Sequence, residues 1–84
     1  MTAWTVLSRA ECSLCEQLLT ELAEELSPAE AARVSVVDVD GDPELVRKYG
    51  HRVPVLLAEG DFVCDYRLNL ERVRQITGQP GPNR

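Results

Sequence analysis

The part of the chain that most constrains the fold is a short apolar run, residues 3–8, followed closely by Cys12-Ser13-Leu14-Cys15. The run is flanked by polar residues and predicts a strand that is covered on both faces. From Ser13 to Leu26 the apolar residues recur with helical spacing, and Ser27-Pro28 ends the helix because proline disfavours helix in the residue before it. A strand therefore passes into a helix at the two cysteines.

The helical phase gives the two cysteines different surroundings. At about 100° per residue, Cys15 shares one arc of the helix with its leucines. These leucines are Leu14, Leu18, Leu19, Leu22 and Leu26. We therefore expect Cys15 to face the core and Cys12 to face solvent. Backbone N–H groups at a helix start lower the pKa of a nearby thiol from about 8.5 to roughly 3.5–7.5, which favours the nucleophilic thiolate at Cys12.

This spacing is typical of a redox pair. Cys15 can attack a mixed disulfide on Cys12 and release the bound partner as a thiol. Glu11 opposes thiolate formation at Cys12, and Arg9 offsets it. The alternative is that both cysteines are ordinary buried residues, which are often inert. The strand before them and the helix after them favour redox chemistry.

Length and charge exclude several classes of function. We expect 84 residues to form a single domain, residues 1–78, with residues 79–84 as a flexible tail. Three cysteines do not form a stapling framework, because a bond between Cys12 and Cys15 closes a very short ring and Cys64 is left over. A net charge of −5, with nine basic residues spread along the chain, argues against nucleic-acid binding.

The hydropathy pattern bears on location. No apolar run approaches the roughly 18 residues of a membrane span, and the first residues do not resemble a secretion signal. We therefore expect a monomer in the cytoplasm with no membrane partner. In that reducing compartment a cysteine pair is more often catalytic than structural.

The rest of the chain predicts three more strands and a short helix. Residues 34–39 are rich in β-branched residues and predict a second buried strand, parallel to the first. Asp42 and Pro43 predict the start of a short helix, with Gly50 as its left-handed stop. Residues 53–58 and 62–64 predict an antiparallel hairpin.

A last helix completes the pattern. Asn69 is its predicted N-cap, and Leu70, Val73 and Ile76 form its apolar stripe. Gly78 is its predicted end. The predicted order of elements is βαβαββα.

This order, with two cysteines at the first helix, resembles the thioredoxin fold and most closely the glutaredoxins, in particular the small bacterial glutaredoxin-like proteins. The matching segments are Cys12-Ser13-Leu14-Cys15, residues 37–45 and Arg52-Val53-Pro54-Val55-Leu56. The resemblance implies an α/β thioredoxin-like fold of the glutaredoxin type, a four-stranded mixed sheet flanked by helices. It also implies a thiol-disulfide oxidoreductase in which Cys12 attacks and Cys15 resolves.

The resemblance further implies a substrate edge. In this family the proline at the position of Pro54 is cis and lies beside the cysteines, and the backbone of the preceding residue, here Val53, pairs with the bound thiol substrate. Arg9 and Arg52 are candidates for contacting a glutathione carboxylate, or are surface charges. Asp65 is the candidate for holding the γ-glutamyl end.

The implied partners are a disulfide-containing protein or a small-molecule thiol such as glutathione, which is a candidate reductant or co-substrate. No bound metal or organic cofactor is required. Two segments depart from dithiol glutaredoxins: Ser13-Leu14 replaces Pro-Tyr, and residues 63–67 replace a Gly-Gly pair followed by acidic residues. Specificity for glutathione is therefore not implied.

Two other classes of function stay open. The chain can be a redox-silent module that binds a peptide beside Pro54. It can also carry a metal or an iron-sulfur cluster on its cysteines. A zinc site of Cys12, Cys15, His51 and Cys64 has suitable ligand types, but its second pair lacks finger-like spacing. We expect Cys64 to be a half-buried strand thiol and His51 to lie in an exposed loop.

Overall fold

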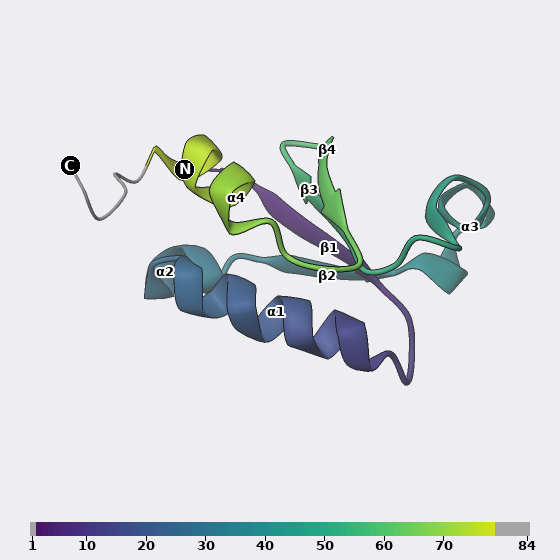
Figure 1. Ribbon diagram of the computed structural model, residues 1–84. Coiled ribbons are helices and arrows are strands. Elements are labelled where there is room, and N and C mark those ends of the chain that lie inside the picture. Colours follow the sequence, from purple (N-terminus) through teal and green to yellow (C-terminus); the bar gives the residue numbers. More distant parts are fainter. Residues whose placement is uncertain (1, 79–84) are drawn as a thin grey trace.

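The computed structural model describes residues 2–78, which form a four-stranded mixed sheet with helices against both faces (Figure 1). The predicted tail, residues 79–84, lies outside the described residues. None of the described helices is long and apolar enough to cross a membrane. In chain order the elements are β1 (Trp4–Ser8), α1 (Ser13–Glu25), α2 (Pro28–Ala31), β2 (Ser35–Asp38), η1 (Val39–Gly41), α3 (Pro43–Tyr49), β3 (Val55–Ala58), β4 (Asp61–Asp65) and α4 (Leu70–Thr77).

The strand order, β2-β1-β3-β4, confirms the predicted α/β architecture. β1 is parallel to β2, because α1 and α2 cross from one strand to the other, and it is antiparallel to β3. β3 and β4 form the predicted antiparallel hairpin. Leu7, near the end of β1, pairs with Val55, the first residue of β3. The segment after β1 and the segment before β3 therefore meet at one end of the sheet.

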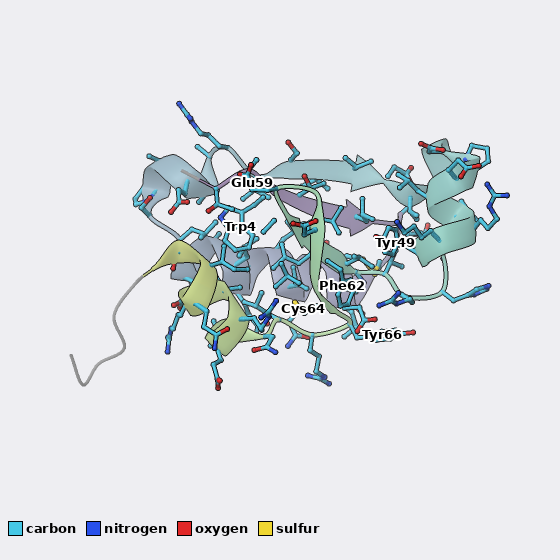
Figure 2. The ribbon with its side chains drawn as sticks, turned by 90° about the horizontal axis from the view of Figure 1, so that it is seen from above. Trp4, Tyr49, Glu59, Phe62, Cys64 and Tyr66 are labelled. Carbon is cyan, nitrogen blue, oxygen red and sulfur yellow. A yellow bond between two sulfur atoms is a disulfide. The ribbon has the colours of Figure 1, made fainter. Side chains whose placement is uncertain are left out.

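Two apolar cores lie on opposite faces of the sheet. The larger core joins Trp4 and Val6 of β1 to Leu18 and Leu22 of α1 and to Val73 of α4. On the other face, β1 and β3 pack against the end of α3 in a smaller core. This second core consists of Leu7, Val39, Tyr49 and Val55. Figure 2 places Trp4 and Glu59 toward one end of the molecule, and Tyr49, Phe62 and Tyr66 toward the other.

The prediction that residues 34–39 form a buried strand is wrong for most of that segment. β2 is an edge strand, and its Val36 is 55% exposed. Only Val39, which lies just after the strand, is fully buried. A β-branched run indicates a strand but does not say whether the strand is central, because that depends on the order of strands in the sheet.

Two details at the helix ends also differ from prediction. Pro28 ends α1 as expected but also opens the short helix α2, with Ser27 as N-cap, because proline is well suited to the first helical position. Gly50 is not left-handed: its φ is −55°. Glycine is required there for another reason, since an added Cβ would collide with the carbonyl oxygen of Val46.

The remaining helix ends confirm the sequence predictions. Asp42 accepts a hydrogen bond from the N–H of Glu44 and caps α3. Asn69 accepts one from the N–H of Arg72 and caps α4. Gly78 ends α4 in the left-handed conformation, with φ 73°.

Candidate functional site

Cys12 is the N-cap residue of α1. Its backbone is extended, with φ −112° and ψ 102°, and its sulfur accepts a hydrogen bond from the backbone N–H of Cys15 at 3.2 Å. Its own carbonyl oxygen accepts from the N–H of Glu16, which closes the first turn. The side chain is half-buried and remains partly open to solvent. The structure thus places the Cys12 sulfur at the positive end of a 13-residue helix.

Cys15 lies behind Cys12, and the two form a disulfide with their Cα atoms 5.2 Å apart. Cys15 is 1% exposed, in agreement with the helical phase. Leu14, however, is 36% exposed, although it was expected on the buried arc. Its direction lies roughly 80° from the centre of the arc of Cys15, Leu18, Leu22 and Leu26, so it falls at the edge of the buried face.

The loop that carries Cys12 is held by Arg9. The guanidinium donates from Nε and Nη2 to the two carboxylate oxygens of Asp40, each at 2.9 Å, and from Nη1 to the carbonyl oxygen of Gly50 at 2.9 Å. Between Arg9 and Cys12, Glu11 adopts the left-handed region with φ 57°. Hydrogen bonding to Arg9 lowers the pKa of Asp40, and the same contact raises the pKa of Arg9.

The peptide bond between Val53 and Pro54 is cis, as the resemblance implied. Pro54 is fully buried, and Val53 is half-buried. Tyr66, which follows β4, holds this segment at both ends: its N–H donates to the carbonyl oxygen of Pro54 at 2.9 Å, and its hydroxyl donates to the carbonyl oxygen of His51. Tyr66 itself is 47% exposed.

The structure also brings together two of the predicted binding residues, Arg52 and Asp65. Nε of Arg52 donates to a carboxylate oxygen of Asp65 at 2.9 Å. The guanidinium lies over the ring of Phe62, 4.6 Å from its centroid, and 5.8 Å from the centroid of Tyr49. Arg52 is therefore not an isolated surface charge.

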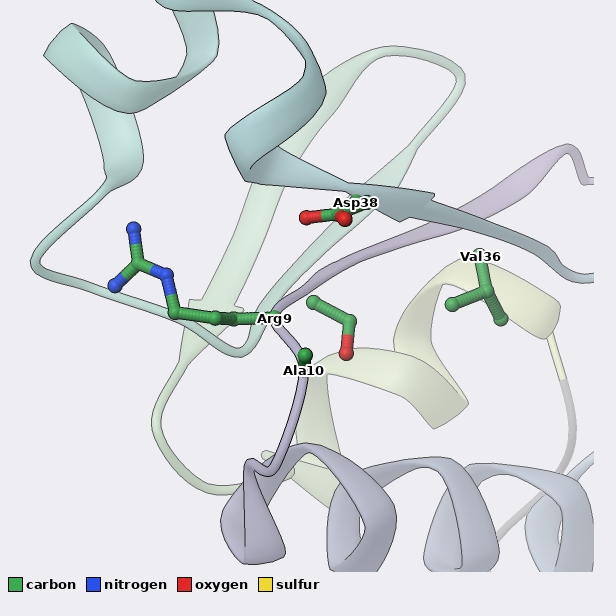
Figure 3. A pocket seen from close by; sticks show the side chains of 5 residues that line it. Arg9, Ala10, Val36 and Asp38 are labelled. Atoms are coloured by element: carbon green, nitrogen blue, oxygen red, sulfur yellow. The ribbon is translucent and has the colours of Figure 1, made fainter.

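A hollow of about 290 Å³ lies beside the cysteine loop, on the side of β2 (Figure 3). Ser8, Arg9, Ala10, Val36 and Asp38 line it. The guanidinium of Arg9 points away from the other lining side chains, in keeping with its bonds to Asp40 and Gly50. The hollow is thus bordered by aliphatic groups, the Ser8 hydroxyl and the Asp38 carboxylate.

Cys64 is on β4 in the larger core and is 8% exposed. Burial raises the pKa of its thiol, which keeps the group protonated and weakly nucleophilic. Among residues 2–78, no three His, Cys, Asp or Glu side chains are grouped closely enough to hold a metal ion. The zinc set of Cys12, Cys15, His51 and Cys64 is therefore not assembled in this structure.

Sequence reasoning missed Asp40, Phe62 and Tyr66 as neighbours of the site. Asp40 is 31 residues from Arg9, and Tyr66 is 15 residues from His51. No local pattern marks such pairs. The only available signals were residue type and the strand order implied by the resemblance, since acids and bases pair across segments that a sheet brings together.

The comparisons with known proteins agree with this geometry. A family model described as a glutaredoxin-like domain (DUF836) matches residues 4–76. Uncharacterized proteins of Mycobacterium tuberculosis and Mycobacterium bovis are 33% identical to the chain over 89 residues, covering 94% of this chain and 91% of theirs.

Two solved structures are also similar. The solution NMR structure of a protein from Nitrosomonas europaea superposes with a TM-score of 0.77 at 31% identity, over 89% of each chain. The X-ray structure of a protein from X. campestris superposes with a TM-score of 0.66 at 30% identity, over 94% of this chain and all of the other.

Proposed function

Because the chain belongs to the glutaredoxin-like (DUF836) family, we propose that it is a thiol-disulfide oxidoreductase in which Cys12 is the nucleophile and Cys15 the resolving cysteine. One observation carries the proposal: the sulfur that caps α1 is partly open to solvent and bonded to a second, buried sulfur. A disulfide that is partly solvent-accessible and lies at the N-terminus of a helix suits thiol exchange better than it suits a structural role.

The reaction begins with the reduced pair. The Cys12 thiolate attacks one sulfur of a substrate disulfide, a bond forms between Cys12 and that sulfur, and the other half of the substrate leaves as a thiolate that takes up a proton. Cys15 then loses its proton and attacks the Cys12 sulfur, so that the Cys12–Cys15 bond forms and the second half of the substrate leaves as a thiol. The substrate has gained two electrons and two protons, and the protein dithiol has lost them.

The helix start supports the first step electrostatically. The N–H of Cys15 that points at the Cys12 sulfur stabilises negative charge on it, and the dipole of α1 adds to this effect. A lower thiol pKa increases the fraction of Cys12 present as thiolate at neutral pH. It also makes Cys12 the better leaving group at the end of recycling: a first reductant thiol attacks the accessible Cys12 sulfur and releases Cys15, and a second then attacks the reductant sulfur of that mixed disulfide and releases Cys12.

The cis-proline segment supports the binding of substrate. We propose that the backbone of Val53 pairs with an extended substrate backbone, an arrangement that uses main-chain hydrogen bonds for affinity. Tyr66 keeps this segment in place through its bonds to Pro54 and His51. A thiol reductant must then restore the dithiol.

Reaction of the reduced protein with a thiol-specific alkylating reagent between pH 4 and 9 tests the proposal. All proteins carry Cys64→Ala, so that only the site cysteines react. We expect Cys12, in the presence of Cys15→Ser, to react at neutral pH at least about tenfold faster than an unactivated thiol, with the midpoint of its pH profile below about 8.5. If Cys12 reacts like an ordinary thiol, the redox-silent binding module becomes the better reading.

A further inference from the structure

Arg9, which lies before the cysteine loop, and Arg52, which lies before the cis-proline segment, are both paired with aspartates of this chain. Arg9 bonds to Asp40 through two donors, and Arg52 bonds to Asp65 through one. Each ion pair lies in a segment that adjoins the cysteine loop or the cis-proline segment. The charge that these arginines offer to an incoming anion is therefore largely cancelled.

The Arg9 guanidinium is the more fully engaged of the two. Its three nitrogens each donate a hydrogen bond, two to Asp40 and one to the carbonyl oxygen of Gly50. A substrate carboxylate that approached Arg9 would compete with a bidentate carboxylate already in place. Charge-assisted bidentate pairs are among the stronger hydrogen-bonded contacts in proteins, so this competition is unfavourable.

Arg52 is held by a different set of contacts. Asp65 occupies its Nε, and the rings of Phe62 and Tyr49 lie against the guanidinium. The Asp65 side chain is 28% exposed, and its ion pair with Arg52 engages the carboxylate that would hold the ammonium of a γ-glutamyl group. The whole chain carries a net charge of −5, which adds long-range repulsion of anions.

Two of the exposed side chains at the site are, in contrast, largely apolar. Leu14 lies between the two cysteines and is 36% exposed, and Tyr66, beside the cis-proline segment, is 47% exposed. Together with the backbone of Val53, these groups suit an extended polypeptide with an apolar side chain next to its cysteine. They offer nothing that recognises the two carboxylates of each glutathione half.

We infer that the substrate is a disulfide on a polypeptide, flanked by apolar and neutral or basic residues, and that the pairs Arg9–Asp40 and Arg52–Asp65 disfavour glutathione disulfide. This inference rests on the proposed function and specifies its substrate class. Asp40 and Asp65 are specificity-determining residues, because each removes an arginine from carboxylate binding.

Single-turnover exchange with two probe disulfides tests this assignment. One probe is glutathione disulfide, and the other is the disulfide dimer of an end-capped tripeptide that has leucine beside its cysteine. The protein is the reduced full chain with Cys64→Ala. Dividing each rate by the rate of the same disulfide with dithiothreitol removes differences in intrinsic reactivity. We expect the neutral peptide to be preferred at least about tenfold.

Asp40→Asn and Asp65→Asn each remove a carboxylate charge that pairs with an arginine, so that this arginine can bind a ligand carboxylate. We expect each variant to reduce the preference for the neutral peptide by severalfold, through a faster reaction with glutathione disulfide. The matched control is Asp61→Asn, which removes the same charge at the other end of β4, where Asp61 pairs with Ala58. Raising the ionic strength is a second measurement that needs no variant: it should speed the reaction of the wild-type chain with glutathione disulfide only.

The outcomes separate the two proposals. Glutathione disulfide reacting as fast as the neutral peptide, or an unchanged preference in both variants, would overturn the substrate class while leaving the redox function intact. A reaction of both probes no faster than with an ordinary thiol would instead remove the proposed function itself.

Discussion

The backbone N–H of Cys15 points at the sulfur of Cys12 from 3.2 Å, so it stabilises negative charge on that sulfur. This contact follows from the N-cap position of Cys12, since the side chain of an N-cap residue accepts from the N–H two or three residues later. The hydrogen bond uses the backbone of Cys15 and not its thiol. Replacing the Cys15 side chain therefore leaves this interaction in place.

The first prediction uses the fact that this hydrogen bond does not involve the Cys15 side chain. Cys12→Ser should abolish disulfide exchange, whereas Cys15→Ser should keep the first step and stop at a mixed disulfide on Cys12. Mass spectrometry after addition of the neutral peptide disulfide would show this adduct as a one-to-one species. Rapid release of the adduct from Cys15→Ser in the absence of added thiol would contradict the resolving role.

The second prediction compares two leucines of α1. Leu22 is 1% exposed in the larger core, and Leu22→Ala should lower the free energy of unfolding by about 2–5 kcal/mol. Leu14 is 36% exposed, and Leu14→Ala should change the free energy of unfolding by less than about 0.5 kcal/mol. The same variant should slow exchange with the leucine-containing peptide. Urea unfolding and single-turnover rates measure the two effects. A large loss of stability in Leu14→Ala would place this side chain in the core.

The third prediction concerns pH. Glu25 at the end of α1 bonds to Arg74 of α4, with Oε2 3.2 Å from Nη2, and this hydrogen bonding lowers the pKa of Glu25 below 4.5. A carboxyl whose folded-state pKa is lowered stabilises the fold above its unfolded pKa, and this contribution is lost as the pH falls through the lowered value. Glu25→Gln should therefore be less stable than wild type at pH 7 and about equally stable at pH 2.

Urea unfolding across that range measures the difference. Glu24→Gln is the matched control, because Glu24 is an exposed residue on the same helix with no ion-pair partner among residues 2–78. A stability difference between wild type and Glu25→Gln that persists at pH 2 would show that the pair is not the cause.

The fourth prediction concerns Cys64. Burial raises the pKa of this thiol, so iodoacetamide should modify it at least about tenfold more slowly than Cys12 in the folded, reduced protein at neutral pH. Peptide mapping gives the two rates separately. Denaturant should remove the difference, and equal rates in the folded state would mean that Cys64 is accessible.

The local features of this protein could be predicted because their causes lie within a few residues. The place of Cys12 at a helix start, the buried phase of Cys15, the caps at Asp42 and Asn69 and the helix end at Gly78 each depend on neighbours within about one helical turn. The cis bond before Pro54 came from the family resemblance and not from local pattern.

The errors have a common origin. Val36 belongs to a strand, as predicted, but its exposure depends on whether another strand lies beside it, and β2 is at the edge. Gly50 was assigned to the wrong conformation because its requirement is the nearby carbonyl of Val46 and not a positive φ. In both cases the predicted element or helix end was correct, but the predicted surroundings of the residue were wrong.

The sequence by itself determined the four strands, three of the helices and the position of Cys12 at the start of the first helix, since backbone propensity, helix capping and side-chain periodicity act over short distances. Only the tertiary structure decided the electrostatics of the site. Arg9 pairs with Asp40, which is 31 residues away in the sequence, and Arg52 pairs with Asp65, which is 13 residues away. Both pairs form because the strand order brings these segments to one end of the sheet. Which charges cancel there depends on contacts between distant segments, and no local pattern encodes them.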